Sequence, residues 1–368
     1  LQQTVANYWQ DWSAACEQAE LSPQAELSVM GKIWACSEFV ARQCIRRPGM
    51  VDELVTEGLE AGRSADDYQQ LVAQAIAAAE PTDEGLMRAL RLLRQKEMVR
   101  IAWRDLAGFA EVEPVLHELS DFAEAVIGQT LDHLYRQTTE TLGTPASVEG
   151  EAQQMLVLAM GKLGGRELNF SSDIDLIFAY AEQGSTEGGR HLSNHEFFVR
   201  LAAKLVRLLD EITQDGFVFR VDTRLRPNGD SGPLAMNFSA MEQYYQLQGR
   251  DWERYAMIKA KIIGGTGADR RYQQRFNVYF PAREKKTVFD ADELICIEEI
   301  DLNSQPFQGR LAGKKSAPSI KSRTGRYVKA IPAKDPRRDF SIAIDATLRA
   351  ALIRRGAHQA SAPLNVKT

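Results

Sequence analysis

The most constraining feature of the sequence is a pair of strand-like segments separated by a glycine-containing turn. Residues 154–160, QMLVLAM, form a short apolar run of the kind found in buried strands. Residues 171–180, SSDIDLIFAY, alternate between polar and apolar side chains before becoming apolar. The residues between them include the adjacent glycines Gly164 and Gly165. These patterns predict two buried strands with a turn between them.

Two carboxylates stand at the start of the second strand. Because side chains alternate along a strand, Asp173 and Asp175 point to one face, while the apolar residues between and after them point into a core. A third strand is predicted at 217–227, FVFRVDTRLRP, and it places Asp222 on one face with three arginines. If the two strands are neighbours, the carboxylates share a surface with Arg220, Arg224 and Arg226.

Three carboxylates on one surface repel one another unless a cation lies between them. Hard oxygen ligands suit Mg²⁺, with Mn²⁺ as an alternative, and two such ions about 4 Å apart can hold the attacking and leaving oxygens of a phosphoryl transfer. Arginines pair with phosphate oxygens, and glycines let backbone N–H groups approach them. An Asp-x-Asp alone fits a solvated strand face, and a Gly-Gly alone fits a simple turn. Their combination with a third strand aspartate favours a metal-dependent site for phosphoryl transfer.

The predicted catalytic and metal-binding residues are therefore Asp173, Asp175 and Asp222. The predicted nucleotide- or phosphate-binding residues are Gly164, Gly165, Ser172, Arg224 and Arg226. Weaker candidates for phosphate contacts follow at Glu253, Arg254, Lys259 and Lys261.

The periodicity of residues 1 to about 142 predicts helices. Residues 90–110, LRLLRQKEMVRIAWRDLAGFA, carry a basic face opposite their apolar one, which predicts either a solvated surface or one that faces an anion or a partner. A loop is predicted at 181–193. Two S-x-x-E capping boxes, Ser193–Glu196 and Ser239–Glu242, predict further helices, the second continuing to about residue 265.

Composition excludes several classes of protein. The 368 residues carry a formal net charge of −5, which gives no overall attraction to nucleic acid or membranes. The four cysteines form no CxxC pair, which fits reduced thiols in the cytoplasm better than disulfides or a zinc site. No apolar run approaches the roughly 20 residues of a membrane span. No Walker-type phosphate-binding loop is present. Because the chain starts at Leu1, we expect a fragment at its N-terminus.

The motifs just described resemble those of a known family. A Gly-Gly, an Asp-x-Asp on a strand and a later strand aspartate look like the nucleotidyltransferase superfamily of the polymerase-β type. MGKLGGRELNFSSDIDLIF, DGFVFRVDTRLRPNGDSGPL and QGRDWERYAMIKAKIIG closely resemble the bacterial glutamine synthetase adenylyltransferases, bifunctional enzymes that add AMP to a tyrosine of glutamine synthetase and remove it. The resemblance covers residues 1 to about 276, and the sequence departs from the family pattern after that.

This resemblance implies an α+β fold, with a helical N-terminal region at 1–145, a nucleotidyltransferase domain at 146–276 and a divergent, poorly ordered tail at 277–368. It implies the removing half of the family, in which Mg²⁺-dependent phosphorolysis releases AMP as ADP, and it matches Asp173, Asp175 and Asp222 to the metal-binding acids. The implied partners are glutamine synthetase, the PII signal protein, phosphate and an adenine nucleotide, without nucleic acid or membrane.

Two alternatives remain from the residues. One is a nucleotidyltransferase with another acceptor, such as a nucleic-acid end, although the mildly acidic chain argues against it. The other is a non-catalytic module that senses a nucleotide or a partner. Such a module is expected to lack one of the three acids, and all three are present.

Overall fold

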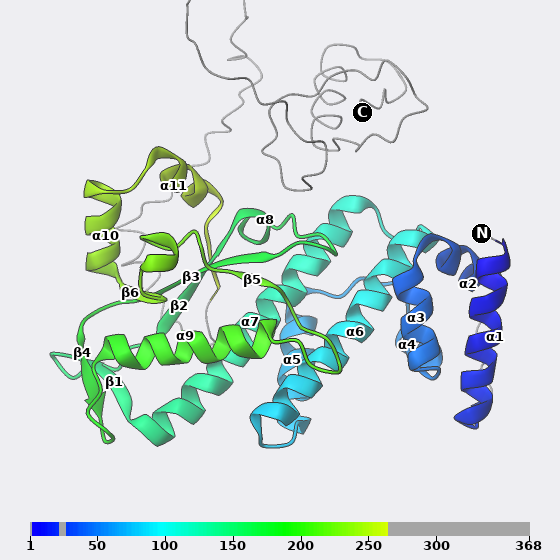
Figure 1. Ribbon diagram of the computed structural model, residues 1–368, viewed down its shortest axis with the longest axis horizontal. Coiled ribbons are helices and arrows are strands. Elements are labelled where there is room, and N and C mark those ends of the chain that lie inside the picture. Colours follow the sequence, from blue (N-terminus) through cyan, green and yellow to red (C-terminus); the bar gives the residue numbers. More distant parts are fainter. Residues whose placement is uncertain (1, 22–26, 264–368) are drawn as a thin grey trace, which may run out of the picture. The chain divides into compact units, whose positions relative to one another are not determined.

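The computed structural model describes residues 2–21 and 27–263, which lie within one compact unit (Figure 1). The predicted tail at 277–368 lies outside the described residues. Within the described part, no helix has the length and apolar character needed to cross a membrane.

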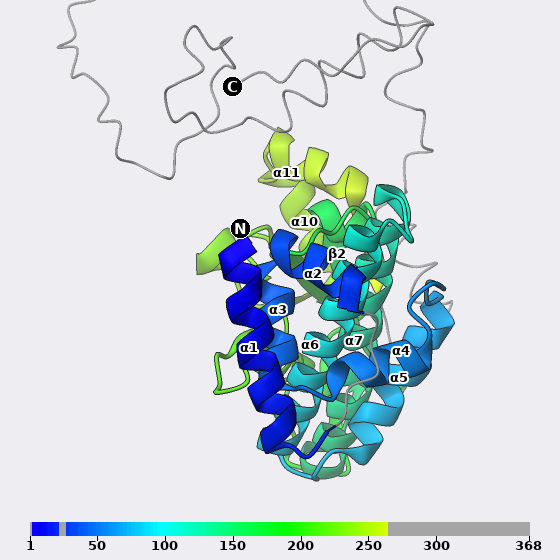
Figure 2. The same ribbon diagram turned by 90° about the vertical axis from the view of Figure 1, so that its right-hand side faces the viewer.

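Helices form the first part of the described chain and confirm the helical prediction up to about residue 142. α1 packs against α2 and α3 (Figure 1, Figure 2), and α5, α6 and α7 pack against one another. α6 begins after the N-cap Thr82 and ends at Gly108, whose left-handed φ of +81° favours glycine. The helices are α1 (Gln2–Gln18), α2 (Leu27–Cys36), α3 (Glu38–Arg46), α4 (Met50–Glu57), α5 (Ala65–Ala78), α6 (Asp83–Ala107) and α7 (Val112–Leu142).

A mixed sheet follows the helices and gives the chain its α+β class. In the described residues the strand order is β5-β3-β2-β7, and β6 pairs with the later part of β3. β2 is antiparallel to β3 and β7, whereas β5 and β6 are parallel to β3. β1 and β4 form a separate antiparallel pair. The strands are β1 (Thr144–Ser147), β2 (Met155–Met160), β3 (Ile174–Tyr180), β4 (Gly184–Glu187), β5 (Val221–Asp222), β6 (Ala235–Asn237) and β7 (Lys261–Ile263).

Both faces of β2 and β3 are buried, as the apolar runs predict. Val157 and Leu176 belong to a core that includes side chains of α5, α6, α7 and α9 (Asn194–Asp210). On the opposite face, Leu158 and Ile177 pack with Phe238 of α10 (Phe238–Leu247). The sheet is thus covered on both sides, and polar side chains are confined to its ends.

The helix at 194 starts as predicted. The Ser193 hydroxyl accepts a hydrogen bond from the Glu196 N–H at 3.2 Å, and the Glu196 carboxylate accepts one from the Ser193 N–H at 3.1 Å. This reciprocal capping box satisfies two backbone donors at the start of α9.

Three other local predictions are wrong. The third strand covers only Val221–Asp222, because the chain turns immediately afterwards and the Arg226 N–H donates to the carbonyl of Thr223. The helix expected from Ser239 begins at Phe238, capped by Asn237, and its expected continuation is instead α11 (Asp251–Ala256), a 3-10 turn and β7. The loop predicted at 181–193 contains β4, which pairs with β1.

A solvated basic face on α6 is also wrong for most of its arginines. Arg100 and Arg104 are buried and bind the buried carboxylate of Glu118 on α7, and Arg100 also donates to Glu97 at 2.9 Å. Arg63 binds Glu97 from the segment before α5. Buried charges of this kind are retained only where they are paired, so this network joins α6, α7 and the segment before α5.

Arg91 on α6 has a different set of partners. It is fully buried, and its guanidinium donates to the carbonyl oxygens of Gly216 at 2.7 Å, Leu208 at 3.1 Å and Glu211. Leu208 and Glu211 are at the C-terminal end of α9, where unpaired carbonyls favour a positive charge. The segment that leads into β5 is therefore fixed to α6.

Candidate active site

Asp175 and Asp222 lie side by side in the sheet. Asp175 is the second residue of β3, and its parallel partner on β5 is Asp222. Neighbouring strands are about 4.8 Å apart, so the two carboxylates start from adjacent backbones and point to the same face. Asp173 is the residue directly before β3. Because it is two residues before Asp175, the alternation of an extended chain places both side chains on the same face. The neighbouring strands that the sequence interpretation required are present.

The surroundings move the pKa values of this pair in opposite directions. Burial raises the pKa of Asp175, and the negative charges of Asp222 and Asp173 raise it further. The pKa of Asp222 is lowered, chiefly by hydrogen bonds from Arg224, whose Nε lies 3.0 and 2.9 Å from the two carboxylate oxygens. A negative charge on Asp175 is therefore unfavourable as the residues stand, and an added cation would relieve it.

Asp173 is the most exposed of the three acids. Its side chain is 51 % exposed and forms an ion pair with Arg220, which also donates to the carbonyl of Ser171. Arg220 thus connects the segment before β5 to the segment before β3. An exposed ion pair of this kind contributes at most about 1 kcal/mol to stability, so it can exchange partners readily.

Gly161, which the sequence interpretation did not single out, contacts the carboxylate of Asp175. It directly follows β2, has a φ of +58°, and a Cβ at this position would lie 2.8 Å from Asp175 Oδ2. Both the backbone conformation and the space therefore require glycine. The available signal was its position directly after the apolar run, where the antiparallel pairing brings the end of β2 to the start of β3.

Gly164 and Gly165 belong to the short helix α8 (Gly161–Gly164) and its end. A Cβ on Gly164 would overlap the carbonyl oxygens of Lys259 and Ala159, so this glycine allows close backbone packing. The Gly165 N–H donates to the carbonyl of Gly161 at 3.1 Å. Ser172 donates to Asn169 Oδ1 at 2.7 Å, in the turn before Asp173. A phosphate contact from any of them stays a prediction.

The two predicted phosphate-binding arginines have different environments. Arg224 is 73 % exposed beside Asp222, where a ligand can reach it. Arg226 is buried and donates to the carbonyl and hydroxyl oxygens of Thr223, both at 2.8 Å, and to the carbonyl of Gly232 at 3.3 Å. These bonds hold the turn after β5 together.

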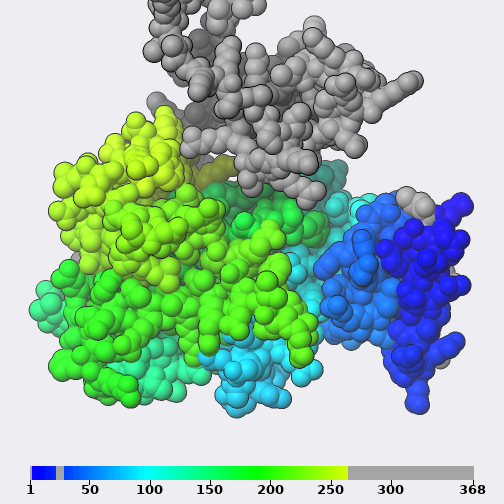
Figure 3. Space-filling view, viewed as in Figure 1, coloured from blue at the N-terminus to red at the C-terminus, as the bar shows by residue number. Residues whose placement is uncertain are grey.

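The four weaker candidates all have structural partners. Glu253 of α11, which is part of the yellow-green surface in Figure 3, is buried and accepts a hydrogen bond from the Tyr244 hydroxyl at 2.8 Å. Arg254 donates to the carbonyl of Tyr245 at 2.9 Å. Lys259 and Lys261 form ion pairs with Glu167 and Glu124, both at 2.6 Å.

The three acids fit a hard divalent cation in ligand type. Carboxylate oxygens are the ligands that Mg²⁺ and Mn²⁺ take in proteins. Between residues 2 and 263, leaving out 22–26, no three His, Cys, Asp or Glu side chains stand ready to hold a metal ion. Asp173 and Asp222 are turned toward arginines instead, so metal binding requires them to reorient.

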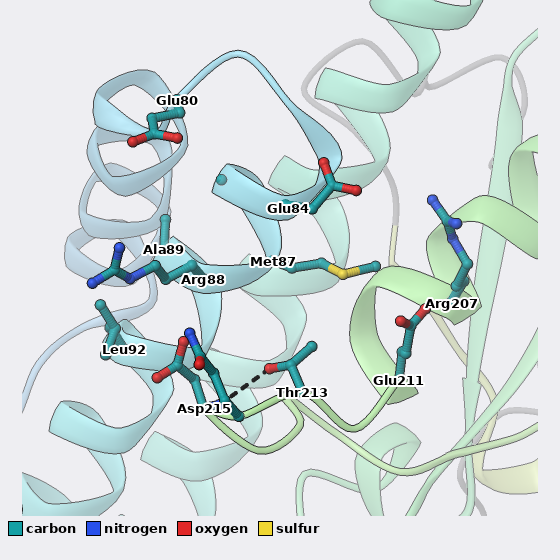
Figure 4. A pocket seen from close by; sticks show the side chains of 12 residues that line it. Glu80, Glu84, Met87, Arg88, Ala89, Leu92, Arg207, Glu211, Thr213 and Asp215 are labelled. Atoms are coloured by element: carbon teal, nitrogen blue, oxygen red, sulfur yellow. Dashed lines mark hydrogen bonds between the residues drawn. The ribbon is translucent and has the colours of Figure 1, made fainter.

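A cavity in the described residues lies away from the acids. It measures about 670 Å³ and lies between the first half of α6 and the segment that follows α9 (Figure 4). Arg88 and Leu92 of α6 line it together with Asp215, whose N–H donates to the Thr213 hydroxyl at 3.2 Å. None of the predicted site residues lines this cavity.

Fold and site together define an α+β protein with paired acids and arginines at one end of a sheet, which suits the handling of phosphate groups. A family model described as glutamate-ammonia ligase adenylyltransferase matches residues 27–278. The chain belongs to this family, which confirms the resemblance seen in the motifs.

Three relatives have the same name, bifunctional glutamine synthetase adenylyltransferase/adenylyl-removing enzyme. The protein from Nitrosococcus oceani is 54 % identical over 242 residues, which cover 65 % of this chain and 25 % of the relative. The protein from Thioalkalivibrio sulfidiphilus is 48 % identical over 260 residues, 69 % of this chain and 26 % of the relative. The protein from Shewanella loihica is 47 % identical over 268 residues, which cover 72 % of this chain and 27 % of the relative. The chain spans about a quarter of the length of these curated relatives.

Proposed function

We propose that this chain removes AMP from an adenylylated tyrosine of glutamine synthetase by phosphorolysis, in a polymerase-β-like nucleotidyltransferase core and in the cytoplasm. An oxygen of inorganic phosphate attacks the α-phosphorus of the adenylyl group, and the bond from that phosphorus to the tyrosine oxygen breaks. The proton of hydrogen phosphate ends on the tyrosine oxygen. The products are ADP and unmodified tyrosine, so atoms and charge balance.

The observation that carries the proposal is the register of β3 and β5, which pairs Asp175 with Asp222. Two adjacent carboxylates, one with a raised pKa, are a costly arrangement for a sheet unless a cation or a reaction uses them. Membership of an adenylyltransferase family, and relatives named for both adding and removing the adenylyl group, support this use.

Asp173, Asp175 and Asp222 would hold Mg²⁺ or Mn²⁺, which when bound neutralises negative charge on the phosphate oxygens. The chain's own residues bind and orient the reactants. Arg224 is exposed beside the acids and can pair with a phosphate oxygen, whereas Arg226 keeps the adjacent turn in place. Most of the rate would come from such positioning and from fixed charges.

We assign the removing direction because the resemblance places this domain after an N-terminal helical region, as in the removing half of the family. Glutamine synthetase, phosphate and an adenine nucleotide are the proposed partners, and the PII protein is proposed from the resemblance alone.

The test is to incubate the chain with adenylylated glutamine synthetase, inorganic phosphate and Mg²⁺, and to measure ADP. Release of ADP that depends on phosphate is the expected result. A second reaction supplies labelled ATP and unmodified glutamine synthetase while ADP is removed, because the same site can run backwards from ADP. Label incorporated under those conditions would reverse the assignment, and no reaction in either direction would favour a sensing module.

A further inference from the structure

Arg94, on the basic face of α6, differs from its neighbours on that helix. Its Nε atom is buried without an acceptor, and its guanidinium has no hydrogen bond or ion pair with any residue in the described part of the chain. The guanidinium lies over the ring of Phe217, 5.0 Å from the ring centre. A partly buried arginine held by an aromatic face alone has donors left for another ligand.

The other basic residues of this stretch already have partners. Arg91 donates to three backbone carbonyls outside α6, Lys96 pairs with Glu53 at 3.3 Å, and Arg100 and Arg104 bind Glu118. The sequence left open whether the basic face of α6 meets solvent or an anion. For Arg94, the lack of a partner favours the anion.

A second arginine lies over the same ring. Arg220 is 5.8 Å from the centre of Phe217, and it also binds Asp173, one of the candidate acids. Burial lowers the pKa of Arg94, and the positive charge of Arg220 lowers it further. Two neighbouring guanidinium groups repel each other, and one of them has no counter-charge. A doubly charged anion bound between them would remove this repulsion.

We propose that Arg94 and Arg220, which both contact the ring of Phe217, bind a phosphate group beside the candidate acids. The inference rests on the proposed function and adds the residues that hold one phosphate. The phosphate is either the inorganic ion that attacks or a phosphate of the adenine nucleotide. Because Arg220 also holds Asp173, phosphate binding would compete for this arginine and release the acid.

The experiment measures binding without glutamine synthetase. The full chain is titrated with inorganic phosphate, AMP and ADP in separate calorimetric experiments, with a chelator present to exclude metal effects. The variant is Arg94→Gln, and the matched control is Arg88→Gln, an exposed arginine on the same helix that lines the cavity of Figure 4. Loss of one charge-assisted contact should weaken binding about tenfold in the variant and leave the control unchanged.

The three ligands separate the sources of the phosphate. Weakened binding of inorganic phosphate assigns the site to the attacking ion, and weakened binding of AMP and ADP alone assigns it to the nucleotide. Equal binding of all three ligands by wild type and Arg94→Gln overturns the inference. In turnover assays, Arg94→Gln should raise the KM for phosphate or nucleotide more than it lowers kcat, and Arg94→Lys should recover part of the binding because it keeps the charge.

Stability provides an independent check. Arg94 has no hydrogen bond within the described chain to lose, only its contact with the ring of Phe217, so Arg94→Gln should melt at most slightly below wild type. A marked fall in melting temperature would show that Arg94 has a structural partner besides Phe217 and would contradict the inference. If Arg94→Gln weakens phosphate binding but the wild type releases no ADP, the inference stands and the proposed function is rejected. If the wild type releases ADP but Arg94→Gln binds phosphate and nucleotide as the wild type does, the proposed function stands and the inference is rejected.

Discussion

The carboxylate of Asp175 lies directly against the backbone of Gly161, so that even one added carbon on this glycine would come within 2.8 Å of Oδ2. The contact joins the end of β2 to the start of β3. The precision of the candidate site therefore depends on a residue without a side chain.

Replacing Gly161 with alanine should harm activity more than stability. The left-handed φ of +58° costs an alanine about 1–2 kcal/mol, and the new methyl group displaces Asp175. Gly108→Ala is the matched control, because Gly108 has a φ of +81° and nothing within 4 Å of the added carbon. Both variants should lose similar stability in urea unfolding, and only Gly161→Ala should lower ADP release by about tenfold or more. Equal activities in the two variants would count against the role of this contact.

Asp173→Asn should abolish Mg²⁺-dependent turnover and leave the fold nearly intact. The side chain is half exposed and its ion pair with Arg220 contributes little to stability, so a change in activity reports on chemistry. Asp230→Asn, an exposed acid 3.6 Å from Arg226, serves as the control and should keep its activity. ADP release and circular dichroism are the measurements. An Asp173→Asn variant that works at near wild-type rate would remove this residue from the mechanism.

Asp175→Asn should raise the melting temperature at neutral pH when divalent ions are chelated. The folded-state pKa of Asp175 is raised, so its ionised form costs stability above that pKa, and the cost disappears as the pH falls below the ordinary value of 3.8. The gain from Asn should vanish over the same range. Asp222→Asn should show the opposite sign, because the pKa of Asp222 is lowered and its stabilising effect is lost on acidification.

Addition of Mg²⁺ completes that experiment. It should stabilise wild type and give less stabilisation to Asp175→Asn, because a ligand that binds the folded state raises its stability. Equal stabilisation of both proteins by Mg²⁺, measured by thermal unfolding across a concentration series, would place the ion elsewhere.

Glu118→Gln should destabilise the helical region by about 3–5 kcal/mol. The carboxylate binds Arg100 and Arg104 in a buried setting and accepts a hydrogen bond from the Arg63 N–H at 3.0 Å, so its loss leaves buried positive charge unpaired. Glu38→Gln, which removes an exposed pair with Arg42, should cost less than about 0.5 kcal/mol. Urea unfolding at constant m-value is the measurement, and a small loss for Glu118→Gln would show that the network tolerates a neutral partner.

Local sequence patterns were sufficient for the elements that local chemistry determines. The Ser193–Glu196 capping box depends on residues three apart, and the apolar run of β2 depends on its own side chains, so both were predictable. The alternation that places Asp173 and Asp175 on one face is also local. The parallel register of Asp175 with Asp222 is not, because it joins strands 47 residues apart and required the assumption that they are neighbours.

Side-chain contacts that periodicity does not reveal account for these errors, some within a turn and others between elements. The alternation of 217–227 fits a strand, but Arg226 bonds within its own turn to Thr223 and Gly232, and this ends β5 after two residues. The arginines of α6 look solvated by periodicity, since nothing in the helix itself reveals that Glu118 of α7 will cover them. Gly161 was missed because its neighbour, Asp175, reaches it only through the pairing of β2 with β3.

The hydrogen bond from Arg91 to Gly216 spans 125 residues, and it has a consequence for recombination between relatives. A chimera that joins the helices of one family member to the sheet of another inherits α6 from one parent and the segment before β5 from the other. The arginine from one parent must then still donate to the three carbonyl oxygens from the other. Without these hydrogen bonds, the segment that leads to Asp222 is no longer held against α6. Crossover points between residues 91 and 216 should therefore yield active hybrids only when both parents keep this arginine and the same segment length.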